Sequence, residues 1–256
     1  MTHSAAAVSR GAYEGVAADV LASRLAVPAV IALDSTPSTL DVAHTVAADG
    51  APDGTLVLAE TQTAGRGRSG KRWTSAPAAG IWLTLVARNL DAATLPLLAL
   101  RLGIAAGAAL ESFANETIGV KWPNDLYVGR GKLAGILAEA RWRDGLPEWV
   151  AIGMGINVSR PPGVSDAAGL RAGTRRLDVL DALIPALRTA AARSGELDAR
   201  ELAALADRDI ARGRHAISPG VGIVRGVSPS GEIIIQLPDG KLVAHRSGSL
   251  VFAEDS

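Results

Sequence analysis

Hydrophobic and polar positions alternate along the first 114 residues in blocks that predict a mixed order of helices and strands. Three short apolar runs have the length of buried strands and end at polar or turn residues: 29–33, 55–59 and 81–87. Three longer segments are typical of helices: 16–26, 40–48 and 95–114. Ser38 or Thr39 can cap the second of these helices, so the polar segment 34–39 before it is predicted to be a loop.

The second half of the chain predicts strands that pair antiparallel. Four strand-like segments follow one another: 120–122, 126–128, 133–139 and 149–158. Turn residues such as Pro123-Asn124-Asp125 and Asp144-Gly145 separate them, and these connections are too short for the crossover that a parallel pair needs. Two helices are predicted next, at 178–194 and 198–209. From about residue 213, four short strands with turns at 228–231 and 238–240 predict a small β-barrel-like domain.

Length and composition support this organisation and exclude several classes of protein. A chain of 256 residues, 48% of them hydrophobic, is long enough for one large domain with a real core and a small appendage. We therefore predict an N-terminal extension with a short helix over 1–30, a central α+β domain over 31–211 and the small C-terminal domain over 212–256. The absence of cysteine excludes disulfides, thiolate metal sites, iron–sulfur clusters and cysteine nucleophiles.

The charges give no general reason to expect binding to a nucleic acid or a membrane surface. The 26 basic and 26 acidic residues balance, so any basic function must be local. The longest uncharged stretch, 73–87, is too short to span a bilayer, and charged residues interrupt the alanine-rich N-terminal segment where a secretion signal needs an apolar core. A cytoplasmic location without membrane contact is therefore expected. The histidines show no metal-ligand spacing and are expected to be structural or on the surface: His3, His44, His215 and His245.

The segment 65–72, Gly-Arg-Gly-Arg-Ser-Gly-Lys-Arg, nearly matches two nucleotide-binding motifs but lacks their context. It satisfies Gly-x-Gly-x-x-Gly, with Asp91 about 20 residues further on, yet a dinucleotide-binding turn must open a helix. It also approaches a P-loop, but Arg72 stands where a magnesium-binding Ser or Thr is needed. Residues 73–80 leave no room for a helix before the next strand, so both interpretations fail.

The charges of this segment instead favour an anion-binding loop. Four cationic residues fall within seven positions of a neutral chain: Arg66, Arg68, Lys71 and Arg72. Glycines between the arginines let the backbone approach an anion. Charge-assisted hydrogen bonds contribute roughly 1.5 to 3 kcal/mol each, so a few of them suffice to hold a triphosphate beside a carboxylate. Trp73, which follows directly, is placed to cover a ligand ring; the alternatives are a solvated basic loop and a tryptophan in the core.

A second group of candidate residues lies in a predicted strand-turn-strand. Lysine occurs only four times in this arginine-rich chain, and Lys121 and Lys132 are two of the four. A lysine in such a chain indicates a need for a compact point charge. Pro123 fixes its own φ and restricts Trp122, so Lys121 and Asp125 are expected to project from a rigid turn, which suits a binding site. A plain hairpin with surface lysines is the alternative.

Four segments together resemble the biotin protein ligases in order and spacing, along about 220 residues from Asp34 to Val251. They are Gln62-Thr-Ala-Gly-Arg-Gly-Arg68 with Trp73, Lys121-Trp-Pro-Asn-Asp125, Lys132-Leu-Ala-Gly135 and Gly153-Met-Gly-Ile-Asn157. The resemblance implies an α+β fold in which helices flank a mixed sheet, as in the class II synthetase-like catalytic domain of biotinyl and lipoyl ligases, with a C-terminal SH3-like β-barrel. It also implies a ligase that uses ATP and Mg²⁺ to attach biotin, through biotinyl-5′-AMP, to one lysine of a biotin carboxyl carrier domain, as in acetyl-CoA carboxylase.

The resemblance also implies roles for the residues that match these motifs. The positions that bind biotin and the adenylate are matched by Gln62, Arg66, Gly67, Arg68 and Lys132, and the same motifs include Gly65 and Gly135. Lys132 resembles the residue that holds the biotin carboxylate against the α-phosphate. The part of the loop that closes over the adenylate is matched by Lys71, Arg72 and Trp73. The nucleotide and metal side is matched by Lys121, Asn124 and Asp125, so Mg²⁺ is expected near Asp125; a turn of the nucleotide pocket is matched by Gly155 and Asn157. The residues expected to act in the chemistry are Lys132, Arg66, Arg68 and Lys121.

A Ser-Thr-Asn biotin contact of the family has two candidate positions in this chain. Counting back from Gly54 favours Ser38-Thr39-Leu40, and the alternative is Ser35-Thr36-Pro37. Both lack the asparagine, which removes one expected side-chain contact but not the activity.

Two rival functions stay open. A lipoate ligase shares the catalytic fold, but its Arg-Arg-x-Ser-Gly-Gly-Gly type of loop is absent here. A catalytically inactive biotin-binding module is the second, and the joint presence of Lys121, Asp125 and Lys132 argues against it. Some family members carry a DNA-binding winged helix; only 33 residues precede Asp34 and they are not basic, so a short form without operator binding is expected. A homodimer through an exposed sheet edge is a further expectation from the family.

Overall fold

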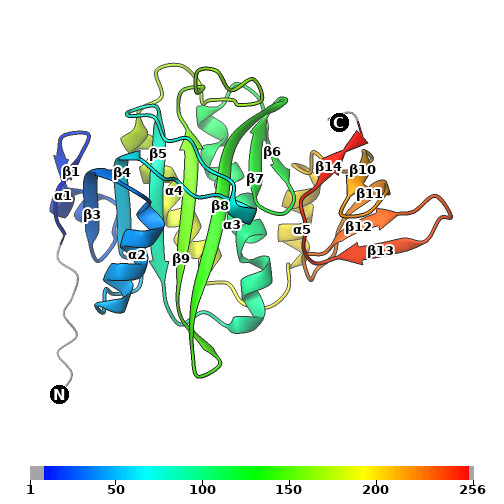
Figure 1. Cartoon of the computed structure of the whole chain (residues 1–256), viewed down its shortest axis with the longest axis horizontal. Helices are drawn as coiled ribbons and strands as arrows, with labels where there is room; N and C mark the ends of the chain where they lie inside the picture. The colour runs from blue at the N-terminus through cyan, green and yellow to red at the C-terminus, as the bar shows by residue number, and fades with distance from the viewer. Residues whose placement is uncertain (1–8, 254–256) are drawn as a thin grey trace.

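A central sheet of seven strands, with helices on both faces, organises the molecule (Figure 1). The structure, a computed structural model, describes residues 9–253. The strand order is β3-β4-β5-β9-β8-β7-β6. The strands span Val30–Thr36 (β3), Leu56–Gln62 (β4), Gly80–Ala87 (β5), Ile118–Lys121 (β6), Asp125–Val128 (β7), Gly131–Arg143 (β8) and Leu146–Asn157 (β9). Only β3 and β4 are parallel within this sheet. The predicted mixed sheet and the antiparallel pairing of its later strands are therefore confirmed.

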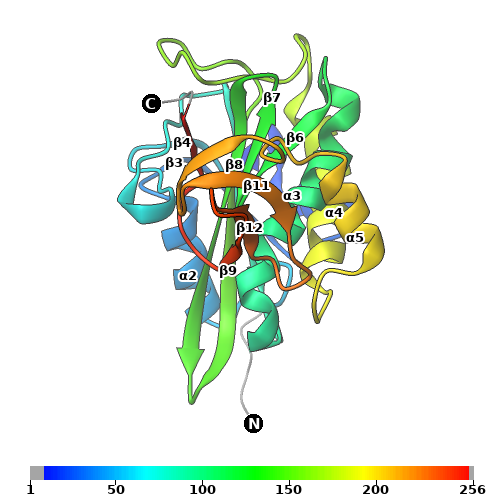
Figure 2. The same cartoon turned by 90° about the vertical axis from the view of Figure 1, so that its right-hand side faces the viewer.

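The helices divide the protein into two layers around this sheet. One face carries α2 (Thr39–Ala48), and the opposite face carries α1 (Ala18–Arg24), α3 (Leu95–Leu110) and α4 (Arg176–Ala191), with α5 (Ala199–Ala206) against α3 (Figures 1 and 2). Short 3-10 turns lie at Arg68–Gly70, Ala92–Thr94 and Glu111–Phe113. The large core fills the face under α3 and α4, whereas a small core under α2 covers only part of the other face. The remainder of that face is left open for a site.

The predicted loop 34–39 is wrong in its first half. β3 continues to Thr36, because Ser35 and Thr36 pair with Thr61 and Gln62 of β4. These strand ends are polar, so the apolar pattern that marks a buried strand does not extend to them. The connection that remains is only two residues long, and the Ser38 hydroxyl accepts the backbone N–H of Leu40 at 3.3 Å as the N-cap of α2.

The helix predicted over 16–26 begins two residues later, because a small hairpin precedes it. This hairpin pairs β1 (Ala12–Tyr13) with β2 (Val16–Ala17). Tyr13 is fully buried, and burial raises the pKa of its phenol. Arg176 of α4 donates to the Tyr13 hydroxyl at 3.0 Å and to carboxylate oxygens of Glu14 and Glu60 at 2.8 Å and 2.6 Å. The hairpin is thereby fastened to α4 and β4.

The C-terminal unit contains five strands where the sequence predicts four. They are β10 (His215–Ser218), β11 (Gly222–Val227), β12 (Ile233–Gln236), β13 (Leu242–His245) and β14 (Val251–Phe252), in the antiparallel order β13-β12-β11-β10-β14 (Figure 1). No pairing joins β13 to β14 within residues 9–253, so the predicted barrel is not closed. The domain boundaries at 30 and 211 stay predictions.

A segment around α3 has the length and composition of a membrane-spanning helix. It covers the 22 residues Ala92–Phe113. Most of the segment is buried, and α3 packs on α4, β6 and β8. The apolar side chains of this segment therefore form part of the protein core.

Candidate functional site

A cavity of about 480 Å³ opens on the sheet face that carries α2, which is the size range of small-molecule sites. All but one of the predicted site residues line it: Ser38, Thr39, Leu40, Gln62, Arg66, Gly67, Arg68, Lys71, Arg72, Trp73, Lys121, Asn124, Asp125, Lys132, Gly135, Gly155 and Asn157. The exception is Gly65, which is buried. A Cβ at Gly65 would lie 2.5 Å from the carbonyl oxygen of Trp73, so glycine is needed there for a close backbone approach.

The floor of the cavity is a single row of residues across four strands. Strand pairing places Lys121 beside Asp125, Asp125 beside Gly135, and Gly135 beside Gly155. Directly paired residues face the same side of a sheet. The two glycines have no side chain, so this part of the sheet is bare while the charged residues stand at its edge. The arrangement suits a flat ligand that is held at one end by charges.

Lys132 reaches the cavity because β8 is irregular. Lys132 and Gly135 are three residues apart, so they would face opposite sides of a regular strand. A register shift between β7 and β8 inserts Leu133 as an extra residue, and Leu133 is fully buried in the large core. The ammonium of Lys132 therefore lies on the cavity side, 2.7 Å from Oδ2 of Asp125 and 5.4 Å from the centre of the Trp73 ring.

The segment 65–73, here called the arginine loop, forms a small hairpin over the cavity. The N–H of Gly67 donates to the carbonyl of Lys71 at 2.8 Å, and the N–H of Trp73 donates to the carbonyl of Gly65 at 2.9 Å. The guanidinium of Arg68 donates to Oδ1 of Asn124 at 3.0 Å and to the carbonyl of Gly248 at 3.4 Å. Arg68 thus joins the loop to the turn after β6 and to the C-terminal unit.

The indole of Trp73 rests on the glycine floor. A Cβ at Gly155 would lie 2.5 Å from the indole Nε1, and a Cβ at Gly135 would lie 3.1 Å from the ring carbon Cζ3. The indole N–H is buried and has no hydrogen-bond partner among the described residues. An unpaired buried donor costs about 1–3 kcal/mol, so a ligand acceptor or a movement of the ring is favoured here.

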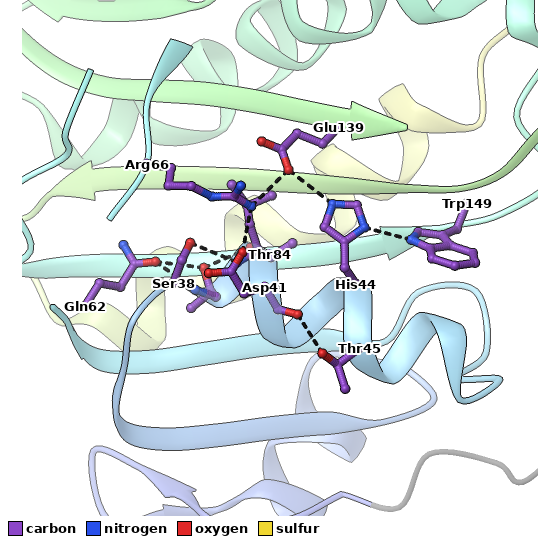
Figure 3. A network of polar contacts seen from close by, with 11 residues as sticks. Ser38, Asp41, His44, Thr45, Gln62, Arg66, Thr84, Glu139 and Trp149 are labelled. Atoms are coloured by element: carbon purple, nitrogen blue, oxygen red, sulfur yellow. Dashed lines mark hydrogen bonds and ion pairs between the residues drawn. The ribbon is translucent and has the colours of Figure 1, made fainter. Parts of the chain in front are cut away.

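Side chains at the start of α2 form a second polar part of the cavity. Oε1 of Gln62 accepts the backbone N–H and the hydroxyl of Thr39 at 2.9 Å and 3.1 Å, while the hydroxyl of Thr84 donates to that of Thr39 at 2.9 Å (Figure 3). The amide nitrogen of Gln62 donates to the hydroxyl of Ser75 at 2.9 Å. These bonds fix the orientation of the Gln62 amide, so its groups are presented to a ligand in one arrangement.

The two candidate Ser-Thr pairs occupy different places. Ser38 and Thr39 line the cavity, whereas Ser35 and Thr36 lie within β3 and are not among the residues that line it. Leu40 follows Ser38 and Thr39, at the position where the family motif has asparagine. Its side chain packs against Gly153: a Cβ built on that glycine would lie 3.0 Å from the Leu40 Cγ. The geometry favours the first pair for contact with a ligand.

Asp125 is the one predicted candidate for contact with a metal ion. Its Oδ2 pairs with Lys132, but its buried Oδ1 has no hydrogen-bond partner in the described part of the chain. No group of three or more His, Asp or Glu side chains that could hold a metal occurs within residues 9–253. Mg²⁺ is commonly bound by one or two carboxylates together with substrate phosphates, and a single carboxylate with a free oxygen fits that mode.

Sequence reasoning missed two segments of the cavity wall. One follows β9 and contributes Pro161, Val164, Asp166 and Ala167; the other, in the C-terminal unit, contributes Ser249, Leu250 and Val251. The carbonyl of Asp166 accepts the backbone N–H of Lys132 at 2.7 Å. Neither segment carries a motif that marks it. Gly153 begins one of the four matching segments but was given no role; its two-residue spacing to Gly155 predicts that both lie on one face of a strand, and both line the cavity.

The chain is similar to known proteins over most of its length. Residues 32–157 match the biotin/lipoate A/B protein ligase family. A bifunctional ligase/repressor from Bacillus subtilis is 38% identical over 130 residues, which cover 50% of this chain and 40% of that protein. A biotin--[acetyl-CoA-carboxylase] ligase from Paracoccus denitrificans is 32% identical over 216 residues, which cover 73% of this chain and 86% of that protein. The chain therefore spans less than half of the first relative and most of the second.

A solved structure shows the same fold. It is a biotin protein ligase from Aquifex aeolicus in complex with biotin and ATP, with a TM-score of 0.68 and 24% identity. The similarity covers 87% of this chain and 97% of that chain. The predicted class, a mixed sheet flanked by helices with a small C-terminal β unit, is confirmed.

Proposed function

The chain belongs to the biotin/lipoate A/B protein ligase family, and we propose on this premise that it activates biotin as biotinyl-5′-AMP and transfers it to a lysine of a biotin carboxyl carrier domain, such as that of acetyl-CoA carboxylase. The observation that carries this proposal is the joint placement of the arginine loop, Lys121 and Lys132 around one glycine-floored cavity. Such a cavity can hold two anionic substrates side by side, which this reaction requires.

In the first step, a carboxylate oxygen of biotin attacks the α-phosphorus of ATP, and the bond to the leaving pyrophosphate breaks. Both reactants are anions, so cations must offset their repulsion and stabilise the additional charge in the transition state. Lys132, Arg66, Arg68 and Lys121 all line the cavity, which supports a role of this kind for them. We assign the contact with the nucleotide to Lys121, from its match to the family motif. Mg²⁺ held by Asp125 and the phosphates would supply further neutralisation of phosphate charge.

In the second step, the neutral ε-amine of the carrier lysine attacks the carbonyl carbon of the biotinyl-adenylate. The bond to the AMP oxygen breaks, an amide forms, and the nitrogen loses a proton. Holding the amine and the anhydride in line can supply roughly 7 to 11 kcal/mol of the barrier. The arginine loop would also exclude water, which protects the adenylate from hydrolysis.

The test of this function is biotin-dependent exchange of labelled pyrophosphate into ATP. We expect rapid exchange with biotin and Mg²⁺, because labelled pyrophosphate attacks the bound biotinyl-adenylate and regenerates ATP and biotin. No exchange is expected when biotin is omitted, because the adenylate then cannot form. Lipoate in place of biotin is the matched control. Exchange with lipoate but not with biotin would keep the chemistry and overturn the substrate, and ATP hydrolysis that needs neither acid would overturn the proposal.

The arginine loop is expected to be mobile in the empty enzyme and ordered by the adenylate. Trypsin can cut the loop after Arg66, Arg68, Lys71 and Arg72. With biotin and ATP present, cleavage there is expected to slow about tenfold or more, because the closed loop must open before it is cut. Arg143, 70% exposed at the tip of the β8–β9 hairpin, provides the internal control and should be cleaved at an unchanged rate. Equal loop cleavage with and without substrates contradicts this prediction.

The roles assigned to single residues rest on the positions that match the family. Contact of Ser38 and Thr39 with biotin, closure of Trp73 over the adenylate and binding of Mg²⁺ at Asp125 are parts of this proposal. The cytoplasmic location, the homodimer and the absence of binding to DNA or to a membrane stay predictions.

A further inference from the structure

Arg66 is held by two carboxylates that belong to different elements (Figure 3). Its Nη2 lies 3.0 Å from Oδ1 of Asp41 on α2 and 3.0 Å from Oε2 of Glu139 on β8. The Arg66, Asp41 and Glu139 side chains are 38%, 56% and 31% exposed, so either ion pair alone would contribute little. A lasting effect on the arginine loop therefore requires that one of the carboxylates be fixed in place by other contacts.

His44 fixes the carboxylate of Glu139. The indole N–H of Trp149 can only donate, and it lies 3.0 Å from Nδ1 of His44, so this nitrogen is the acceptor and carries no proton. The proton of the neutral ring is then on Nε2, which donates to Oε2 of Glu139 at 3.1 Å. That oxygen is the one that also accepts from Arg66. Trp149 is 6% exposed and belongs to the small core under α2, so a rigid part of the protein determines where the carboxylate points.

We propose that His44 and Glu139 are positioning residues that hold Arg66, and through it the arginine loop, against the part of the cavity formed by the start of α2 and Gln62. Neither His44 nor Glu139 is among the described residues that line the cavity, so both act through Arg66. The identity of the ligand, biotin, rests on the proposed function. The sequence predicts only a structural or surface histidine at position 44, because its two partners, Glu139 and Trp149, are distant in the chain.

Two substitutions of His44 separate its two hydrogen bonds. In His44→Gln, the amide nitrogen takes the place of Nε2 and still donates to Glu139, while the acceptor for Trp149 is lost. In His44→Asn, the amide oxygen takes the place of Nδ1 and still accepts from Trp149, but the side chain is too short for Glu139. A merely structural histidine predicts that the glutamine variant is the more damaged one, because it leaves the buried indole N–H without a partner. The proposal predicts the opposite: His44→Asn should affect the amide exchange of the arginine loop and the KM for biotin more than His44→Gln does.

The first measurement needs no ligand and no activity. Amide hydrogen exchange is followed at Gly67 and Trp73, whose N–H groups close the arginine loop. We expect exchange at both amides to become about tenfold faster in His44→Asn and to stay within about twofold of the parent in His44→Gln. Equal exchange in the two variants, or faster exchange in His44→Gln, overturns the proposal. If His44→Asn exchanges faster than His44→Gln but the parent protein does not bind biotin, the proposed function is overturned while the positioning role stands.

The second measurement is the KM for biotin and the KM for ATP in pyrophosphate exchange. His44→Asn is expected to raise the KM for biotin about tenfold with little change in the KM for ATP, because the loop adjoins the α2 part of the cavity. In an Arg66→Ala background the same substitution should have no further effect, since the residue through which it acts is gone. A rise of both KM values together, or an undiminished effect in the Arg66→Ala background, overturns the proposal.

Discussion

Lys132→Ala is expected to lower the rate of biotin-dependent pyrophosphate exchange by a factor of about 10² to 10³, the loss that follows removal of one preorganised group from a transition state. The ammonium of Lys132 stands at the edge of the glycine floor, 2.7 Å from Oδ2 of Asp125. In the empty enzyme, the ion pair with Asp125 holds the ammonium of Lys132 at the cavity. In the proposed mechanism, the same charge lies where biotin and ATP, the two anions, approach each other. Alanine leaves that approach without this cation and removes the ion pair of Asp125 with Lys132.

The matched control for this substitution is Lys241→Ala. Of the four lysines of the chain, Lys241 is the one that lies outside both the arginine loop and the motif segments at 121–125 and 132–135. It is exposed and directly precedes β13. Exchange by Lys241→Ala should equal that of the parent. Exchange by Lys132→Ala at a rate close to that of the control would show that the adenylate forms without Lys132, and the assignment of this site would be wrong.

The second large effect is expected on stability. Arg101→Ala should lower the free energy of unfolding by about 3 to 5 kcal/mol, because it removes the buried partner of the Glu201 carboxylate, which then keeps the weaker 3.5 Å contact with Nε of the more exposed Arg193. Arg101 of α3 is 2% exposed, and its Nε lies 2.7 Å from Oε1 of Glu201 in α5, which is 8% exposed. The same guanidinium donates to the carbonyls of Gly195 and Glu196 at 3.1 Å and 3.0 Å. One side chain thus fastens α5 and the preceding turn to the core helix.

Urea denaturation at constant pH measures this effect, with Arg200→Ala as the control. Arg200 is exposed on α5, so its removal should change the free energy of unfolding by less than about 0.5 kcal/mol. A double variant that removes both charges, Arg101→Met with Glu201→Leu, is expected to recover part of the loss, since no uncompensated charge stays buried. An unchanged midpoint for Arg101→Ala would mean that Glu201 finds another partner or water.

The pairing of the last four strands of the central sheet was predictable from local patterns, whereas the order of β3, β4 and β5 was not. The short turns after Lys121, Val128 and Arg143 allow only antiparallel neighbours, and the structure has β6, β7, β8 and β9 side by side in this way. Strand ends were less predictable, because the ends of β3 and β4 are polar and lack the apolar residues that mark a buried strand; at the end of β4, Gln62 lines the cavity. The β1–β2 hairpin was missed for a similar reason, since its stability depends on burial of Tyr13 and on contacts of Glu14 with distant Arg176.

The sequence by itself predicted most of the motif residues that line the cavity, because the chemistry of two anions requires particular residue types, and those types are grouped in short motifs. It did not determine which way these residues face. Lys132 points into the cavity only because an extra residue, Leu133, is accommodated where β8 pairs with β7. The wall formed by Ser249, Leu250 and Val251 depends on how the C-terminal unit docks. Register and docking are set by contacts between segments far apart in the chain, which no local periodicity records, so only the tertiary structure could decide them.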